Sequence, residues 1–486
     1  MPENVLLTKY TRMIPKDIAL TLGLPQVPGD KRPIYLTDIQ RSAIVTGGPG
    51  SGKTFSVIDP AVRSAIAQGL PIILYDYKYP EQTSRHIGFA KRMGYRVDQF
   101  VPGHSESQTV NLLDFLRGDT DTARALEIAD VLYGNFVRQK SQDREDSFFA
   151  NAGKRLIQAA LARAKSTKYP DLAMAHAILA LPLLGFRIEK DKDCNPWVRS
   201  QFDQLVSVRD SEKTAASIIG TATSVFGRMM MPDILPALSE TSTIPLDLYS
   251  RQLLILGMNR EKQSTVAPIL ATVLHMLLIR HIAKDDPERL LVVLDELPTL
   301  YLPDLSKMLN TCRELGVGFL LAVQNLAQID RIYGEKARAE IFGACATKAI
   351  YNPQDYKTAQ MLSDYMGKMD VLHWQRSFSY GKNSHGRSRT HIRQTRALLE
   401  PYEILKLRTG EGILISPGFQ DRREAYLPLK VKVTIPKADL QLSATSQQLW
   451  QAVIRPYLQA NSALPEVRAT DLQLRRAHAE ELMPVL

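Results

Sequence analysis

The segment from residue 47 to residue 54 constrains this chain more than any other, because it reads Gly-Gly-Pro-Gly-Ser-Gly-Lys-Thr. It matches the phosphate-binding pattern G-x-x-x-x-G-K-[ST] at every fixed position, and we call it the P-loop. Glycines let the backbone turn so that successive N–H groups point at phosphate oxygens. We expect Lys53 to reach the β- and γ-phosphates and the Thr54 hydroxyl to bind Mg²⁺. The predicted nucleotide-binding residues are Gly47, Gly48, Pro49, Gly50, Ser51, Gly52, Lys53 and Thr54.

The flanking sequence supports a phosphate site. An apolar strand is expected just before the P-loop, at Ala43–Thr46, and a helix after it, from Phe55 to Ala67, although Pro60 falls in its first turns. The N-terminus of such a helix attracts anions. A chance match in a glycine-rich turn is the alternative, and the order strand, loop, helix argues against it.

Alternating strands and helices predict an α/β fold with a mostly parallel sheet covered on both faces. The expected strands are near-continuous apolar runs, typical of central strands. They are Ala43–Thr46, Ile72–Tyr75, Leu253–Met258, Leu290–Leu294, Gly318–Val323, Thr347–Tyr351 and Gly412–Ile415.

One long interval interrupts this alternation. Between Tyr75 and Leu253 most of the sequence has helical periodicity, for example in Asp121–Lys140 and Ser147–Lys165. We expect an all-α domain at residues 116–239, inserted into a core built from residues 1–115 and 240–433. Removing the insertion brings Lys53 and Asp295 within a span that one compact core can fill. Residues 434–486 are expected to form a helical appendage.

A second motif stands at the end of the strand Leu290–Leu294, where Asp295 and Glu296 follow an apolar run. Ligands of open α/β sheets bind at the carboxyl ends of the strands. We expect Asp295 to support Mg²⁺ and Glu296 to act as the general base that activates water. The alternative is that the two acids only cap the next helix. Together with Lys53 they make ATP hydrolysis the leading hypothesis.

Two further residues are candidates on position alone. Gln324 ends the strand that follows the acids, where an amide can sense the γ-phosphate, or it is an ordinary strand-end glutamine. Arg313 lies in the helix between these strands and could complete the site of a neighbouring subunit, as in ring ATPases, or could be a surface arginine. Asp76 and Lys78 follow another strand and could reach Mg²⁺ waters or a subunit boundary, or form a strand-end ion pair.

The stretch 377–396 carries cations without any acid: Lys382, Arg387, Arg389, Arg393 and Arg396. It is expected to be a mobile basic loop or an extended hairpin. Such a segment could bind nucleic-acid phosphates without sequence preference, with Tyr380 and His385 stacking on single-stranded bases. A solvated surface loop is the competing interpretation.

The composition sets limits on this hypothesis. A chain of 486 residues is enough for about two to four domains. The net charge of +10 is compatible with a polyanionic partner but does not require one. Three scattered cysteines without C-x-x-C spacing argue against a zinc site and a disulfide framework. No secretory signal or transmembrane segment is evident, and the apolar stretch Thr265–Ile282 is expected to be a buried helix.

Several segments resemble the coupling ATPases of type IV secretion, the motors of conjugative DNA transfer. Arg313–Val317 followed by Gln324-Asn325-Leu326-Ala327-Gln328-Ile329 is the most specific match, because it follows that family's R-x-x-G-[IV] and Q-[SN]-L-x-Q-[IL] pattern. The other matching segments are the P-loop, Tyr75–Lys78, Leu290–Leu300, Tyr333–Gly334 and Arg396–Pro401.

The resemblance implies a RecA-like homo-hexamer that hydrolyses ATP with Mg²⁺ and translocates DNA. It implies that Arg313 is an arginine finger acting on the next subunit and that Gln324 is a sensor. It places the all-α domain where relaxase or other cargo docks, and it implies components of the type IV secretion channel as partners. Family members usually begin with a membrane-spanning hairpin, which is not evident here, so we expect a cytoplasmic chain recruited to the inner membrane by partners. Tyr79 stands where the family favours glycine, which leaves the role of Lys78 open.

Two other hypotheses stay open. One is a related ring ATPase that energises secretion or pilus assembly without pumping DNA. The other is a docking adaptor in which bound nucleotide only sets the shape of the ring. Glu296 argues against the adaptor, because a protein that only binds nucleotide does not need a general base.

Overall fold

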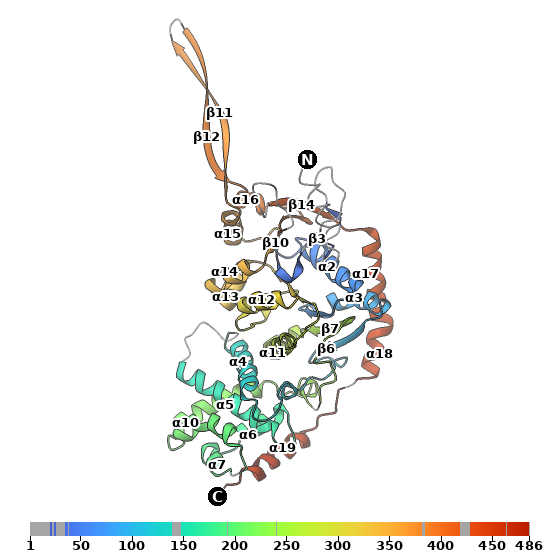
Figure 1. The fold of residues 1–486 in the computed structure, drawn as a ribbon, viewed down its shortest axis with the longest axis vertical. Coiled ribbons are helices and arrows are strands. Elements are labelled where there is room, and N and C mark those ends of the chain that lie inside the picture. The colour runs from blue at the N-terminus through green and yellow to red at the C-terminus, as the bar shows by residue number, and fades with distance from the viewer. Residues whose placement is uncertain are drawn as a thin grey trace.

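The computed structural model describes residues 20–21, 24–25, 35–36, 38–138, 147–191, 193–239, 241–381, 384–417, 428–462 and 464–485. A ten-stranded sheet lies at its centre (Figure 1). In order across the sheet, the strands are β2 (Leu24–Pro25), β14 (Leu429–Thr434), β13 (Glu411–Ile415), β10 (Thr347–Ile350), β4 (Ala43–Thr46), β9 (Val317–Val323), β8 (Leu290–Leu294), β5 (Ile72–Asp76), β7 (Gln252–Gly257) and β6 (Arg96–Phe100).

The strands from β10 to β6 are parallel, and β13, β14 and β2 extend the sheet in antiparallel pairing. The predicted α/β class with a mostly parallel sheet is therefore confirmed. Strands β6 and β14 were not predicted. Both lie toward the edges, where a strand is partly exposed and its sequence lacks a continuous apolar run. Outside this sheet, β1 (Leu20–Thr21) pairs with β3 (Tyr35–Leu36).

Helices cover both faces of the sheet, because alternate residues of each central strand point to opposite sides. Val45 packs with apolar residues of α2 (Asp59–Gln68) and α3 (Glu81–Arg92), whereas Ile44 belongs to the cluster on the other face. That other face carries α11 (Gln263–Ile282), α12 (Leu305–Glu314), α13 (Leu326–Tyr333), α14 (Glu335–Ala344) and α15 (Tyr356–Met366).

Helix α11 is the most apolar helix of the core. Residues 260–282 have the length and composition to cross a membrane, and 83% of the most apolar window is buried inside the fold. The bent pair α6 (Leu172–Leu179) and α7 (Leu184–Lys190) passes the same test only if it is counted as one span. The burial of α11 is that of a core helix, as expected from the sequence.

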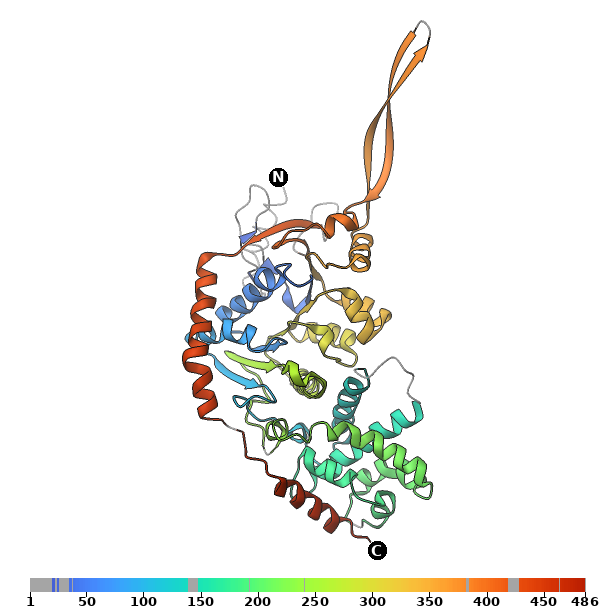
Figure 2. The ribbon, with the colours of Figure 1, turned by 180° about the vertical axis from the view of Figure 1, so that it is seen from behind.

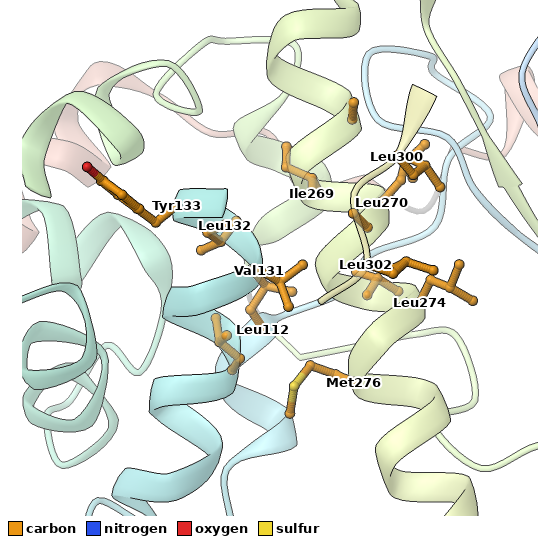
Figure 3. Close-up of a cluster of buried hydrophobic side chains, with 14 of the residues drawn as sticks. Leu112, Val131, Leu132, Tyr133, Ile269, Leu270, Leu274, Met276, Leu300 and Leu302 are labelled. Atoms are coloured by element: carbon orange, nitrogen blue, oxygen red, sulfur yellow. The ribbon is translucent and has the colours of Figure 1, made fainter. Parts of the chain in front are cut away.

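The segment between β6 and β7 is helical and lies at one end of the molecule (Figure 1). Its apolar side chains pack without interruption onto those of the sheet. Figure 3 shows Val131 and Leu132 of α4 facing Ile269 and Leu270 of α11 across this junction. The boundaries 116–239 of a separate domain remain a prediction. Besides α6 and α7, the helices here are α4 (Thr122–Arg138), α5 (Ser147–Lys165), α8 (Pro196–Arg199), α9 (Asp203–Ser207) and α10 (Glu212–Gly227).

The basic stretch forms a hairpin, so the alternative of a basic loop at 377–396 is wrong. Strand β11 (Lys368–Gly381) pairs with β12 (Ser384–Ala397) along its whole length, and the ribbon projects far from the body (Figure 1). The hairpin begins nine residues earlier than the predicted stretch. Lys382 falls outside the described residues.

The C-terminal segment lies along the outside of the molecule as a strap (Figure 2). Helices α17 (Lys437–Leu449) and α18 (Arg455–Ala460) run along the outside of the core, joined by a π-helical turn at Trp450–Ile454. Helix α19 (Ala469–Leu482) then lies against the helical end of the molecule. Helix α17 begins at Lys437, and its Ser446 packs closely on Gly88 of α3 and accepts a hydrogen bond from the backbone N–H of Gly88.

Candidate active site

A cavity of about 320 Å³ opens at the carboxyl ends of the central strands. The P-loop follows β4, while the acids follow β8 and Gln324 follows β9. Since these three strands are neighbours and parallel, their ends meet at one edge of the sheet. The cavity is lined by Gly48, Pro49, Gly50, Gly52, Lys53, Thr54, Phe55, Tyr77, Lys78, Glu81, Gln82, Asp295, Glu296, Gln324 and Thr409.

The glycines of the P-loop are required by its backbone. Gly50 and Gly52 have φ values of 72° and 95°, a region that residues with a side chain rarely adopt. A Cβ atom at Gly52 would lie 2.7 Å from the backbone nitrogen of Gly410. The chain then enters helix through a π-helical turn at Thr54–Ile58, ahead of Pro60 in the first turn of α2. Pro60 has no backbone N–H to donate, and it lies where the π-helical turn passes into α2.

Residues that lie far from the P-loop in the sequence donate hydrogen bonds to its backbone carbonyls. The Nε2 of Gln354 donates to the Pro49 carbonyl over 2.9 Å, and the Oγ1 of Thr409 donates to the Gly50 carbonyl over 3.0 Å. The backbone N–H of Gly410 also donates to the Ser51 carbonyl. Gln354 precedes α15 and Thr409 precedes β13, so these contacts bracket the segment that carries the hairpin. We call them the P-loop clasp.

Lys53 lies buried at the floor of the cavity. Its Nζ donates to the carbonyl of Gly47 over 3.0 Å and lies 3.9 Å from Oε2 of Glu296. Burial lowers the pKa of Lys53, and the negative charges of Glu296 and Asp295 oppose that shift. The ammonium group is thus held beside the acids by a backbone carbonyl and a single ion pair, both of which a phosphate could replace.

Asp295 and Glu296 lie at the end of β8 with raised pKa values. Burial, followed by the charge of Asp76, raises the pKa of Asp295 to about 7. Burial also raises the pKa of Glu296, against the opposing effects of Lys53 and Gln324. The Oε1 atom of Glu296 is buried without a hydrogen-bond partner among the described residues. A buried carboxylate oxygen aimed into a cavity has the chemistry of a general base toward water.

Beneath the acids, a short chain of hydroxyl groups fixes the backbone. The hydroxyls of Tyr75 and Thr299 are hydrogen-bonded over 2.6 Å, and Thr299 donates to the backbone carbonyl of Glu296 over 2.6 Å. Tyr75 is fully buried in β5. These contacts position the turn after β8.

Asp76 is buried near the acids and does not form an ion pair with Lys78. Its Oδ2 accepts hydrogen bonds from the backbone and the hydroxyl of Thr83, each 2.9 Å long. Burial raises the pKa of Asp76 to about 6, and its Oδ1 has no partner among the described residues. Lys78 is exposed and lines the cavity. Within the described chain Asp76 and Lys78 form no ion pair, so that alternative is wrong.

Gln324 joins the site directly. Its Nε2 donates to Oε2 of Glu296 over 2.9 Å, so the end of β9 is tied to the end of β8. Any change in this hydrogen bond alters both the pKa of Glu296 and the link between the two strands. This geometry is that of a residue that can register the state of the site.

Arg313 does not reach the cavity of its own chain. It is exposed in the last turn of α12, which runs back from the end of β8 to the start of β9. The backbone contact between Gly316 and Leu290 places this turn at the amino-terminal edge of the sheet, opposite the cavity. The Arg313 guanidinium has no hydrogen bond or ion pair with the residues that the structure describes. It is therefore available to a neighbouring molecule.

The residues present fit a magnesium-bound nucleotide. The Thr54 hydroxyl and the Asp295 carboxylate line the same cavity, and hard oxygen ligands suit Mg²⁺. The described residues contain no group of three or more His, Cys, Asp or Glu side chains placed to hold a metal ion. This sparse set suits Mg²⁺, which keeps several waters and binds mainly through one or two protein ligands and substrate phosphates.

Sequence reasoning missed the contacts that support the site. Thr409 and Gln354 of the P-loop clasp, and Thr299 below the acids, carry no local motif. Only alignment with related chains or the fold itself reveals residues that lie hundreds of positions from the P-loop. The burial of Asp295 and the nearby charge of Asp76, which raise the pKa of Asp295, are likewise properties of packing.

A family model described as the TraM recognition site of TraD and TraG matches residues 289–409, the part that includes the acids, Arg313 and Gln324. The chain is 25% identical over 247 residues to the coupling protein TraD of Escherichia coli (strain K12), covering 49% of this chain and 34% of TraD. It is 23% identical over 397 residues to the type IV secretion system-coupling protein VirD4 of Bartonella quintana (strain Toulouse), covering 77% of this chain and 60% of VirD4.

The chain is similar in sequence to the coupling proteins of type IV secretion. Its fold matches that of the plasmid coupling protein TrwB in complex with the ATP analogue ADPNP, with a TM-score of 0.61, 15% identity, and coverage of 82% of this chain and 86% of TrwB. TrwB in complex with ADP and Mg²⁺ matches with a TM-score of 0.60 at 16% identity, over 86% of this chain and 95% of TrwB. The chain therefore shares the fold of TrwB, an α/β core with an added helical region. It spans between 34% and 60% of the length of those two curated relatives.

Proposed function

We propose that this chain is a coupling protein of type IV secretion and a magnesium-dependent ATPase that drives DNA transfer. The main observation behind the proposal is that residues at the ends of three neighbouring strands meet at the carboxylate of Glu296. Oε2 of Glu296 lies 3.9 Å from Nζ of Lys53 and 2.9 Å from Nε2 of Gln324. The fold match to TrwB, which was solved with ADPNP and with ADP and Mg²⁺, supports a nucleotide as the ligand.

Each residue has a role that its position permits. Lys53 exchanges the Gly47 carbonyl for the β- and γ-phosphates, while the backbone N–H groups of the P-loop surround them. Thr54 and Asp295 hold Mg²⁺, which neutralises charge on the phosphates when it is bound. Glu296 accepts a proton from the attacking water, and Gln324 orients Glu296. Burial raises the pKa of Glu296, which makes its carboxylate a stronger base toward water.

The site is completed by a neighbouring copy. Arg313 is exposed and far from the cavity of its own chain, so it contributes to catalysis only across a subunit boundary. A closed ring gives every copy an identical neighbour, and a homo-hexamer is the assembly that the family resemblance implies. The arginine then stabilises charge that develops in the transition state.

The transported substrate is DNA bound without sequence preference. The net charge of +10 and the basic hairpin favour a polyanion. A relaxase or other cargo docks on the helical region, and the ring delivers the attached strand to the secretion channel at the cytoplasmic side of the inner membrane. A ring ATPase that energises secretion or pilus assembly without pumping DNA is the second candidate, because the ATPase site alone does not specify which molecule is transported.

An ATPase assay with and without DNA, run beside a mass measurement of the assembly, tests the proposal. We expect Mg²⁺-dependent turnover that single- or double-stranded DNA stimulates, from a complex of six chains. Lys53→Ala should abolish turnover, and Lys307→Ala, at an exposed surface lysine, serves as the matched control. If the turnover of Lys53→Ala stays within about twofold of wild type, the proposal that this site hydrolyses ATP is wrong. Turnover that DNA leaves unchanged would favour the secretion-energising alternative.

A further inference from the structure

Phe55 is a large apolar side chain that is open to the nucleotide cavity. It is the first residue after the P-loop, in the π-helical turn Thr54–Ile58, and 37% of it is exposed. Val57 and Ile58 of the same turn are buried in the core, whereas Phe55 lines the cavity together with residues of the P-loop. An exposed phenyl ring gives up the stabilisation that burial would provide. Its position in the wall of the cavity makes the ring a candidate surface for a ligand.

The ring of Phe55 is held from one side. The guanidinium carbon of Arg85, in α3, lies 4.4 Å from the centre of the ring, and a guanidinium in that position attracts the ring by a cation–π interaction. Arg85 is itself buried between two acids. Its Nη1 lies 3.5 Å from Oδ2 of Asp59, and its Nη2 donates to Oε1 of Glu81. Arg85 thus covers one face of the ring, so the exposed surface of Phe55 belongs to the other face and the edge.

A buried amide at the same cavity has an unpaired oxygen. Gln82 precedes Arg85 by one turn of α3, so the two side chains lie on the same side of the helix. Gln82 is 1% exposed and lines the cavity, and its Oε1 has no hydrogen-bond partner among the residues that the structure describes. A buried acceptor without a donor is destabilising. Ionised phosphate groups carry only acceptors, whereas the ribose hydroxyls and the N–H groups of a base are donors that suit this oxygen.

We propose that the base of the bound nucleotide stacks on the exposed face of Phe55 and that Gln82 accepts a hydrogen bond from the nucleoside. The P-loop backbone and the start of the following helix hold the phosphates. Phe55 directly follows Thr54, so its ring is within reach of a nucleoside that extends from those phosphates. Stacking on an aromatic face accepts any base, and the larger ring system of a purine gains more from it than a pyrimidine does. This inference rests on the proposed function and names the residues that recognise the nucleoside part of the substrate.

Arg85 is the positioning residue of this arrangement. It contacts the face of Phe55 that the base does not use, and its ion pairs with Asp59 and Glu81 restrict its own movement. Asp59 is fixed in turn by His86, whose Nε2 lies 3.2 Å from Oδ1 of Asp59. A ring that is already held in place loses less freedom when a ligand binds, which favours affinity.

Isothermal titration calorimetry of the full chain with Mg²⁺ tests the proposal, with a non-hydrolysable ATP analogue, its CTP counterpart and inorganic tripolyphosphate as ligands. Tripolyphosphate has no nucleoside, so it measures the phosphate-binding part alone. Phe55→Ala should raise Kd for the ATP analogue about 10-fold, leave Kd for tripolyphosphate within about twofold, and abolish the preference for the purine. Phe55→Tyr keeps an aromatic ring and should retain the affinity of wild type. Tyr249→Ala is the matched control, because Tyr249 is an exposed aromatic residue outside the cavity with Nζ of Lys284 4.7 Å from its ring centre.

Gln82→Leu provides a second test with two opposite readouts. The substitution removes the unpaired acceptor and keeps an apolar side chain in its place, so the nucleotide-free chain should melt at a higher temperature than wild type. The same substitution removes a hydrogen bond to the nucleoside, so Kd for the ATP analogue should rise about fivefold while Kd for tripolyphosphate stays unchanged. A residue that only supports the fold would not stabilise the free chain and weaken the nucleotide together.

Three results would overturn the proposal. They are equal losses of the ATP analogue and tripolyphosphate in Phe55→Ala, an unchanged Kd for the ATP analogue in that variant, and a wild-type chain that binds the ATP analogue no more tightly than tripolyphosphate. A chain that binds neither ligand would defeat this proposal together with the proposed function. A chain that binds ATP through Phe55 but does not hydrolyse it would defeat the proposed function alone.

Discussion

Gln324 donates a 2.9 Å hydrogen bond from Nε2 to Oε2 of Glu296, the same oxygen that lies 3.9 Å from Nζ of Lys53. Three segments far apart in sequence thus meet on one carboxylate oxygen. The three residues come from the ends of β9 and β8 and from the P-loop after β4, which are neighbouring parallel strands. The arrangement couples the protonation of the proposed base to a residue that could sense the nucleotide.

Removing the Gln324 side-chain amide should impair catalysis, because that amide acts on the proposed general base Glu296. The hydrogen bond from Gln324 lowers the pKa of Glu296, so Gln324→Ala should raise that pKa further. We expect kcat to fall about 10- to 100-fold and the acidic limb of the kcat/KM profile to move to higher pH. Gln360→Ala, which removes an amide bonded to Asp364 on the exposed side of α15, is the control. An unmoved pH profile in Gln324→Ala would contradict the assigned role.

Arg313 should act on a neighbouring copy. Arg313→Ala is expected to lower ATP turnover of the assembly by about 10³-fold while leaving nucleotide affinity nearly unchanged. Mixing it with Lys53→Ala creates boundaries that pair an intact P-loop with an intact arginine. In a random equimolar ring, roughly a quarter of the boundaries are complete, and a corresponding fraction of the activity should return.

Arg331→Ala, at an exposed arginine of α13, is the control for loss of a surface charge. No recovery of activity on mixing, with subunit exchange verified by mass, would assign Arg313 a structural role instead.

The raised pKa of Asp295 predicts how the nucleotide-free protein responds to pH. Its pKa is about 7 in the folded chain, against an ordinary value of 3.8. The folded state therefore binds the proton more tightly than the unfolded state. The associated stability is complete below about pH 4 and is lost as the pH rises through about 7.

Asp295→Asn keeps this position neutral at every pH. Relative to wild type, it should gain on the order of 2–4 kcal/mol in free energy of unfolding between about pH 5 and about pH 8 without Mg²⁺. Urea denaturation at the two pH values measures the difference. Asp304→Asn, at an exposed aspartate, should show no such trend. A difference that is equal at both pH values would place the charge of Asp295 in a solvated environment.

Helix α19 of the C-terminal strap should be held by a buried ion pair. The guanidinium of Arg475 donates from Nε to Oδ2 of Asp171 over 2.9 Å, and Asp171 also caps α6 by accepting from the backbone N–H of Met174. Arg475→Ala leaves a buried carboxylate unpaired, which costs about 3–5 kcal/mol. We expect α19 to detach and to become accessible to protease.

Arg476→Ala is the matched control, because Arg476 is exposed and pairs only with Glu480 one turn away. That variant should change stability by less than about 0.5 kcal/mol. If both variants leave α19 equally protected, the contacts of Ala479 and Met483, which are fully buried, hold the helix without the ion pair.

The sequence determined the parts of this protein whose chemistry is local. The order of Gly50, Gly52 and Lys53 specifies a loop that cradles phosphate, and an apolar strand that ends in Asp295 and Glu296 specifies acids at a sheet edge. Turn geometry and strand burial depend on neighbouring residues, so both patterns could be read directly. The seven central strands were predictable for the same reason.

Only the tertiary structure decided what depends on distant segments meeting. It placed Thr409 and Gln354 on the P-loop, set Asp76 beside Asp295, and docked Arg475 on Asp171 across the molecule. It also fixed the register in which β11 pairs with β12. Burial, pKa shifts and pairing across the sheet arise from packing between segments far apart in the chain. A local sequence pattern does not predict that packing.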